Sequence, residues 1–157
     1  MTPAINLLRK AGIAHQVLSY EHDPGAASYG LEAVEKLDLP AHSVFKTLLA
    51  ASEKNELLVA IVPVAGQLDL KALASVAGGK KATLAGVAEA ERRTGYVTGG
   101  MSPFGQRTAH PVFIDESAAQ HQTVFVSAGR RGLEIEIRPE DLVMLTNAQV
   151  AKIATLD

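Results

Sequence analysis

Apolar residues recur along the chain with two periods, one typical of helices and one typical of strands. Leu31, Val34 and Leu37 lie three residues apart, which favours one face of a helix. Thr2 and Pro3 suit the cap and the first position of a helix that Gly12 would end. We predict helices from Pro3 to Gly12 and over 29–37, 70–76 and 88–93, a helical turn at 139–141 and a terminal helix over 148–153.

The segments that resemble strands are short apolar runs bounded by turn residues. The runs 44–51 and 57–63 are separated by four polar residues, which predicts a β-hairpin. Alternation is clearest over 133–137, where the leucine and isoleucines face one side and Glu134 and Glu136 face the other. Further short strands are predicted over 17–20, 112–114 and 123–127.

Helices and strands are mixed, and hairpins outnumber strand–helix–strand units, which favours an α+β fold. We expect one domain over residues 1–157, with a mixed, mostly antiparallel, β-barrel-like sheet surrounded by helices. A chain of 157 residues that is 47% hydrophobic is long enough to bury an ordinary core. It contains no cysteine, which excludes disulfides, thiolate metal sites and a cysteine nucleophile.

Targeting signals and charge indicate where the protein is located and how it could bind a nucleic acid. No apolar stretch reaches about 18 residues, and the chain begins without the pattern of a secretory signal, so we expect a cytoplasmic protein with no membrane partner. The formal net charge of −2 provides no overall basic field, so local patches would have to hold a nucleic acid. Candidates are Lys80-Lys81, Arg92-Arg93 and Arg130-Arg131, although such pairs are most often solvated surface.

Lys46 is a charged residue inside an otherwise apolar strand. It shares a face with Val44 and Leu48, whereas Phe45 and Thr47 face the other side. An ammonium group among aliphatic side chains is costly unless it reaches water or meets an anion. Two interpretations stay open: a lysine on an edge strand that reaches water, or a group that binds a phosphate or polarises a carbonyl.

The segment Gly99-Gly100-Met101-Ser102-Pro103 combines adjacent glycines with a serine and a proline. Successive N–H groups in such a turn can form a concave donor site for an anion. The run matches neither the Walker phosphate loop nor the dinucleotide fingerprint, and an ordinary turn is the alternative. Ser102 has the chemistry of a nucleophile, but no His–Asp partnership is visible from spacing, so we favour a loop of backbone donors.

The other candidates are isolated polar residues. No two of the five histidines have the spacing of metal ligands, so we expect no metal and no cofactor. Tyr20 closes an early strand as either core or pocket wall, and Ser127 ends a strand where it either faces a pocket or forms a turn. Glu134 lies on the polar face of its strand, so a solvated carboxylate is its default interpretation.

These residues, taken in order along nearly the whole chain, resemble the YbaK-type Cys-tRNA(Pro) deacylases. This family is related to the editing domain inserted in bacterial prolyl-tRNA synthetases. The runs that carry the resemblance are Met1-Thr2-Pro3-Ala4, Tyr20-Glu21-His22-Asp23-Pro24, Phe45-Lys46-Thr47-Leu48-Leu49, Pro63 to Lys71, Ser75 to Lys81, Thr94-Gly95-Tyr96, Gly99 to Pro103, and Val126 to Leu133.

The resemblance implies removal of cysteine mischarged onto proline tRNA, with the substrate thiol attacking its own ester to form a cyclic thiolactone. Lys46 corresponds to the family's key lysine. We assign stabilisation of the oxyanion to the N–H groups of Gly100, Met101 and Ser102. The residues expected to bind substrate are Tyr20, Phe45, Thr47, Gly99, Pro103, Ser127, Gly129 and Glu134.

Two positions depart from the family pattern, which often has Asp where Glu134 stands and Gly where Ala128 stands. The expected partners are Cys-tRNA(Pro) and prolyl-tRNA synthetase, with the protein itself a monomer. Two other functions stay open. One is a deacylase of alanine or another small residue that uses an activated water, and the other is a non-catalytic module that binds tRNA or the synthetase.

Overall fold

The computed structural model describes residues 1–156. Its α-helices are α1 (Pro3–Ala11), α2 (Tyr29–Leu37), α3 (Leu70–Val76), α4 (Val87–Thr94) and α5 (Pro139–Thr146), with short 3₁₀ turns at Ala41–Ser43 and Glu116–Gln120. Its strands are β1 (Gln16–Ser19), β2 (Phe45–Ser52), β3 (Leu57–Pro63), β4 (Gly66–Leu68), β5 (Ala82–Leu84), β6 (Val112–Asp115), β7 (Val124–Arg130), β8 (Leu133–Ile137), β9 (Gln149–Ala151) and β10 (Ala154–Leu156).

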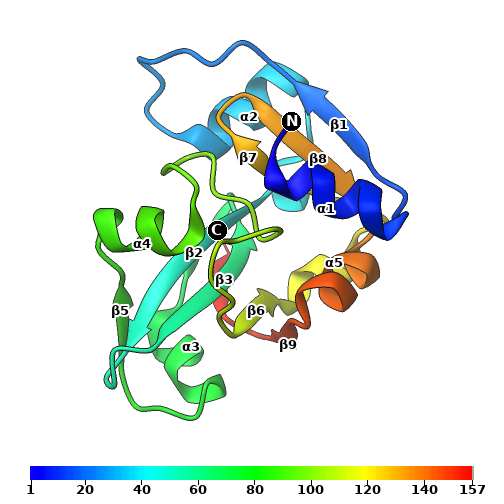
Figure 1. Cartoon of the computed structure of the whole chain (residues 1–157). Helices are drawn as coiled ribbons and strands as arrows, with labels where there is room; N and C mark the ends of the chain where they lie inside the picture. Colours follow the sequence, from blue (N-terminus) through cyan, green and yellow to red (C-terminus); the bar gives the residue numbers. More distant parts are fainter. Residues whose placement is uncertain (157) are drawn as a thin grey trace.

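The strands form three sheets, as Figure 1 shows for the two larger ones. The five-stranded sheet has the order β5-β2-β3-β6-β9, the three-stranded sheet has the order β1-β8-β7, and β10 pairs with β4. Most neighbours are antiparallel, whereas β3–β6 and β6–β9 are parallel. The expected α+β class and mixed, mostly antiparallel sheet are confirmed, and the described strands do not close into a barrel.

Helix boundaries follow from local capping chemistry. The Thr2 hydroxyl accepts a hydrogen bond from the Ile5 N–H at 3.2 Å, and Gly12 ends α1 with a φ of 67°. Ser28 caps α2 in the same way through the Leu31 N–H. Asp69 caps α3 through the Ala72 N–H at 3.0 Å. These short-range signals are the reason that the sequence predicted the helices well.

The core has two layers, one on each face of the five-stranded sheet. The first lies between the two larger sheets and is closed by α1 and α5, with buried residues such as Leu8, Ile61, Ile135 and Leu142. The second lies beneath α3 and the C-terminal strands and includes Leu73. Because β2 and β3 contribute to both layers, the β2–β3 hairpin is the centre of the molecule.

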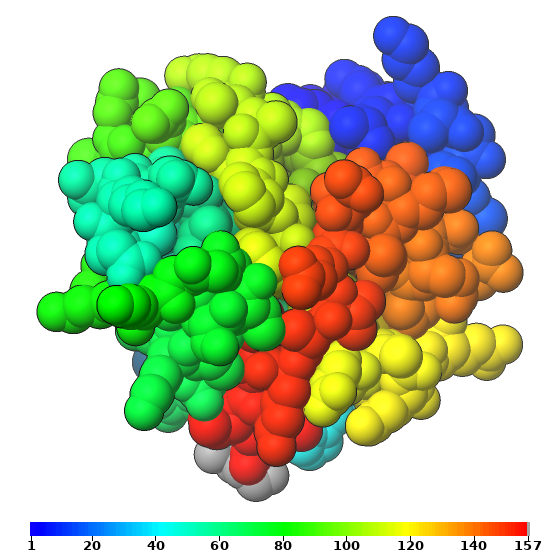
Figure 2. All heavy atoms as spheres, turned by 90° about the horizontal axis from the view of Figure 1, so that it is seen from below, coloured from blue at the N-terminus to red at the C-terminus, as the bar shows by residue number. Residues whose placement is uncertain are grey.

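The C-terminal segment differs from the sequence prediction. The helix expected over 148–153 is wrong, because β9 adds parallel to β6 and β10 adds antiparallel to β4. The Asp115 carboxylate also accepts hydrogen bonds from the Ile153 and Ala154 N–H groups, both at 2.9 Å. Figure 2 shows this segment, in red, between residues of the β4–α3 region and the β6 region. Partners distant in sequence therefore overrode local helical spacing.

Other differences are smaller. The helical turn expected at 139–141 is a complete helix, α5, and β4, β5, β9 and β10 had no clear signal because each has three residues. None of the helices among residues 1–156 has the length and apolar character that crossing a membrane requires.

Candidate functional site

A cavity of about 430 Å³ lies along the edge of β2, between the two larger sheets. This volume is within the range of about 300–1,000 Å³ that is typical of small-molecule sites. The start of α2, the β5–α4 connection and the loop 98–101 complete its walls. Most of the lining is apolar, and its polar residues are Ser28, Tyr29, Lys46, Thr47, Thr98, Ser127 and Glu134.

Lys46 lies on the wall formed by β2 and is half-buried. Its Nζ donates to the Gly66 carbonyl at 3.4 Å, near the upper limit for a hydrogen bond. The described residues place no carboxylate within ion-pair distance of this ammonium group. Lys46 therefore reaches the cavity with its charge largely uncompensated, which an anionic ligand could balance.

Glu134 is the acidic residue of the cavity, and its burial corrects the sequence interpretation. The central strand β8 holds it between Leu18 of β1 and Ser127 of β7. Only 7% of the residue is exposed, so the solvated carboxylate expected from alternation is wrong. At Glu134 the polar face of β8 is covered by the cavity walls rather than by water. Burial raises the pKa of Glu134 to about 8, because removal from water penalises the charged form.

The hydroxyl groups of Ser127 and Thr47 differ in their hydrogen bonding. The Ser127 Oγ accepts a hydrogen bond from the Gly129 N–H at 3.1 Å across a bulge in β7. The Thr47 Oγ1 is buried and has no hydrogen-bond partner among the described residues. A buried polar atom without a partner is uncommon and is often a site that a ligand completes.

The glycine-rich loop contributes only part of what was expected. Gly99 and Met101 line the cavity, whereas Gly100, Ser102 and Pro103 do not. The Gly100 N–H donates to the Val97 carbonyl at 2.9 Å within a turn. Ser102 is fully buried, and its Oγ accepts from the Phe104 N–H at 3.3 Å. The donor role assigned to Gly100 would therefore require this turn to open.

Tyr29 lines the cavity and Arg131 packs on its ring, an arrangement that the sequence did not indicate. The Arg131 guanidinium lies 4.7 Å from the centre of the Tyr29 ring, and its Nε donates to the Thr98 carbonyl at 2.8 Å. Gly99 has a φ of 86°, and a Cβ there would lie 2.5 Å from the Tyr29 ring. Glycine is thus required for the loop to pack on Tyr29. The sequence indicated Tyr29 only as the start of a helix and Arg131 only as part of a basic pair.

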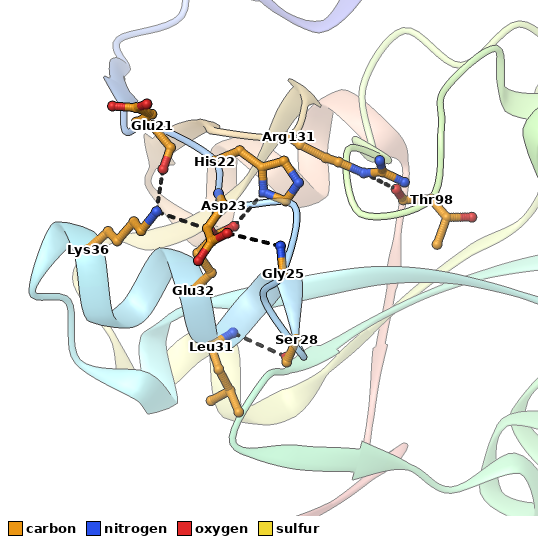
Figure 3. A network of polar contacts seen from close by, with 10 residues as sticks. All are labelled: Glu21, His22, Asp23, Gly25, Ser28, Leu31, Glu32, Lys36, Thr98 and Arg131. Carbon is orange, nitrogen blue, oxygen red and sulfur yellow. Dashed lines mark hydrogen bonds and ion pairs between the residues drawn. The ribbon is translucent and has the colours of Figure 1, made fainter.

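A polar network holds the loop before α2, as Figure 3 shows. Glu32 is buried and accepts hydrogen bonds from His22 Nδ1 and from the Asp23 N–H, both at 2.7 Å, while Lys36 Nζ lies 3.2 Å away. Burial alone would raise the pKa of Glu32, but these hydrogen bonds outweigh it and lower the pKa to about 2. The network fixes the segment that places Tyr29 and Ser28 at the cavity.

Tyr20 and Gly129 complete the set of sequence candidates, and neither lines the cavity. Tyr20 is half-buried next to the network. Burial, together with the charges of Glu134 and Glu32, raises the pKa of Tyr20 to about 12. The sequence candidates that line the cavity are Phe45, Lys46, Thr47, Gly99, Met101, Ser127 and Glu134.

The paired basic residues do not act alike. Arg92 and Arg93 both pair with Glu89 on the same helix, so part of their charge is compensated. Lys80, Lys81 and Arg130 are exposed. These exposed residues remain available to phosphate groups at the surface.

Comparisons with known proteins agree with this architecture. Residues 23–145 match a family described as "Aminoacyl-tRNA editing domain". The chain is 40% identical over 121 residues to the "Putative Cys-tRNA(Pro)/Cys-tRNA(Cys) deacylase EbsC" of Enterococcus faecalis, covering 77% of this chain and 74% of that protein.

Two solved structures show the same fold. One, described as "Crystal structure of a putative trans-editing enzyme for prolyl tRNA synthetase", has a TM-score of 0.84 and 24% identity and covers 99% of each chain. The other, described as "Crystal structure of hypothetical protein APE2540", has a TM-score of 0.86 and 21% identity, covering 98% of this chain and 100% of that one. From the family match and the identity to the Enterococcus relative, the chain belongs to the family of aminoacyl-tRNA editing domains.

Proposed function

We propose that the protein is a trans-acting deacylase that removes cysteine mischarged onto proline tRNA. The observation that carries this proposal is one small apolar cavity that holds a cation and a buried carboxyl, with the Lys46 ammonium on one wall and Glu134 on another. An aminoacyl ester of RNA offers an ammonium group and a nearby phosphate, which complement these two groups. The relative's name and the family match support the same substrate class.

Glu134 suits an α-ammonium group because its carboxyl has no hydrogen-bond partner among the described residues. Its pKa of about 8 keeps it mostly protonated at neutral pH. A bound ammonium group would favour the charged form and lower this pKa. Substrate binding would therefore ionise Glu134 and form an ion pair only when an amino acid is present.

The chemistry is consistent with a substrate that supplies its own nucleophile. The chain has no cysteine, and we propose that the sulfur of the cysteinyl group attacks its own ester carbonyl. A sulfur–carbon bond forms, the ester carbon–oxygen bond breaks, and the thiol proton ends on the ribose oxygen that leaves. The products are a cyclic thiolactone and uncharged tRNA.

In this route the protein has to position the substrate thiol and to polarise the ester carbonyl. Holding the thiol against the carbonyl can contribute about 7–11 kcal/mol, and one well-placed donor to the oxyanion about 2.7–4 kcal/mol. We place Lys46 at the ester or at the phosphate of the terminal ribose, and the N–H of Met101, a residue that lines the cavity, stays a candidate oxyanion donor. We propose that Tyr20, Ser127 and the other sequence candidates help to bind the substrate.

We also propose that the protein acts as a monomer with prolyl-tRNA synthetase. The overall charge of −2 predicts few phosphate contacts and a weak, salt-dependent tRNA affinity. A synthetase that already holds the tRNA would compensate for the small number of phosphate contacts. Added synthetase should therefore raise the deacylation rate at physiological salt more than at low salt.

A deacylation panel tests the proposal. Wild-type protein is incubated with cysteinyl-, seryl- and alanyl-tRNA(Pro), and loss of the aminoacyl group is followed over time. The thiol route predicts rapid loss of cysteine and almost no loss of serine or alanine. A water-activated deacylase would remove alanine or serine as well, and a binding module would remove none.

Lys46→Ala provides the test within the protein. We expect a loss of deacylation on the order of 10²–10³-fold, because an uncompensated charge at the reacting group is removed. Lys54→Ala is the matched control, since Lys54 lies in the exposed turn at the far end of the same hairpin. Circular dichroism should show both variants folded. Turnover by Lys46→Ala at the wild-type rate would remove Lys46 from the site.

A further inference from the structure

The edge of β2 that faces the cavity carries backbone N–H and C=O groups that do not bond to β3. The Val64 N–H donates to the Val44 carbonyl at 2.8 Å, and the Ser52 N–H donates to the Glu56 carbonyl at 2.9 Å. Because bonded and non-bonded pairs alternate in an antiparallel ladder, the even-numbered residues of β2 bond to β3. Thr47 therefore directs its N–H and C=O away from β3, toward the opposite edge.

That opposite edge is unpaired next to Thr47. The strand β5 pairs with β2 only from Ala50 onward, and the last bond toward it joins the Ala85 N–H to the Leu49 carbonyl at 2.9 Å. At the other end of β2 a single bridge joins Val44 to Phe125. The cavity occupies the gap between these two contacts, so the Thr47 backbone borders it without a strand partner among residues 1–156.

The Thr47 side chain points to the same conclusion independently. The residue is 8% exposed and lines the cavity, and its Oγ1 is a buried atom without a hydrogen-bond partner among the described residues. Leaving a hydroxyl unsatisfied in an apolar environment is unfavourable, and a valine of the same shape would avoid it. A backbone N–H and a hydroxyl of one residue thus both lack partners beside one cavity.

We propose that Thr47 binds the carbonyl oxygen of the aminoacyl ester, with its backbone N–H and its hydroxyl as two donors. This inference rests on the proposed function. The carbonyl oxygen accepts hydrogen bonds, and it is the substrate atom that gains negative charge during attack on the ester. The two charged groups of the substrate already have complements in Glu134 and Lys46. The Gly100 N–H, by contrast, is already bonded to Val97.

The first experiment compares three variants in cysteinyl-tRNA(Pro) deacylation. Thr47→Val should lower kcat by about 10²-fold with little change in KM, because the lost donor acts mainly in the transition state. Thr47→Ser keeps the hydroxyl and should recover at least tenfold of that loss. Thr83→Val is the matched control, since Thr83 is exposed on β5 outside the cavity, and it should leave the rate unchanged. A wild-type kcat for Thr47→Val, or a change in KM alone, overturns the inference.

The second experiment uses wild-type protein and does not depend on turnover. The amide of Thr47 is followed by NMR during titration with 3′-alanylamino-3′-deoxyadenosine, whose amide carbonyl replaces the ester and lacks a thiol. The inference predicts a downfield shift and slower hydrogen exchange of the Thr47 N–H. An unmoved Thr47 amide overturns it. If wild-type protein deacylates nothing, the proposed function fails, and the Thr47 shift still decides whether this edge binds an aminoacyl carbonyl.

Discussion

Two glutamates with nearly equal exposed fractions behave in opposite ways. Glu32 is 6% exposed and Glu134 is 7% exposed. Burial penalises both charged forms, but Glu32 accepts hydrogen bonds from His22, Asp23 and Lys36, and its pKa falls to about 2. Glu134 is buried without such hydrogen bonds from the described residues, and its pKa rises to about 8.

The difference separates a structural carboxylate from one that is available to a ligand. Donors from the protein complete the Glu32 site, so that residue holds the loop before α2. No group among the described residues forms a hydrogen bond with the Glu134 carboxyl. The Thr47 hydroxyl, which borders the same cavity, also lacks a hydrogen-bond partner within residues 1–156. Unsatisfied polar groups cost stability, and two of them, on Glu134 and Thr47, border the same cavity, as is typical of a functional site.

The largest expected effect is on the pH dependence of stability through Glu134. Because its pKa is about 4.5 in the unfolded chain and about 8 in the folded one, stability is lost as pH rises between these values. The loss is at most about 5 kcal/mol. Glu134→Gln should therefore be more stable than wild type at pH 8 and nearly equal to it at pH 4.5.

Urea unfolding at several pH values measures this difference. Subtracting the curve of Glu134→Gln from that of wild type removes the titration of other groups. If the unfolding free energies of wild type and Glu134→Gln changed in parallel from pH 4.5 to 8, the raised pKa of Glu134 would be contradicted. A non-cleavable aminoacyl adenosine should reduce the wild-type loss at high pH, because its ammonium group pairs with the carboxylate.

Glu32→Gln should act in the opposite direction. We expect a loss of about 1.5–3 kcal/mol at pH 7, because hydrogen bonds to a charged carboxylate are weakened. The pKa of Glu32 is depressed, so its stabilisation is present above pH 4.5 and is lost as pH falls toward 2. Chemical denaturation at pH 7 and pH 3 checks this sign. A variant that loses as much at pH 3 as at pH 7 would indicate a packing effect instead.

A pair of glycines tests whether the cavity wall is as tightly built as the Glu32 network. Gly99 and Gly78 have φ values of 86° and 83°, so alanine is strained at both. A Cβ at Gly99 would overlap the Tyr29 ring, whereas the space around Gly78 is open. Gly99→Ala should therefore lose about 1–3 kcal/mol more than Gly78→Ala. Equal losses in thermal unfolding would show that Tyr29 moves aside without cost.

The smallest expected effect concerns Lys36. Its ammonium group lies at the surface and pairs with Glu32 at 3.2 Å, so Lys36→Met should cost less than about 1 kcal/mol. The loss should shrink further in 1 M salt, since exposed ion pairs are screened. A cost as large as that of Glu32→Gln would mean that Lys36, rather than the Asp23 N–H and His22, dominates the network.

Local signals allowed much of the fold to be predicted. Thr2, Ser28 and Asp69 act on the backbone a few residues away, so the helices that they cap could be read from order along the chain. The same holds for the β2–β3 hairpin, whose partners are adjacent in sequence. The three-residue strands of the C-terminal segment exist only through partners such as Asp115, which is far away in sequence.

The candidate site divides in the same way. The sequence alone determined that Lys46 and Thr47 occupy a strand, that a glycine-rich loop exists, and that no cysteine is present. Only the tertiary structure decided which side of β8 is covered, because alternation distinguishes two faces without saying what lies against either. It also decided that the Gly100 N–H is bonded within a turn, that Tyr29 lines the cavity with Arg131 packed on its ring, and that β2 has no strand partner beside Thr47 among the described strands. Pairing and burial depend on segments far apart in the chain, and no local pattern records them.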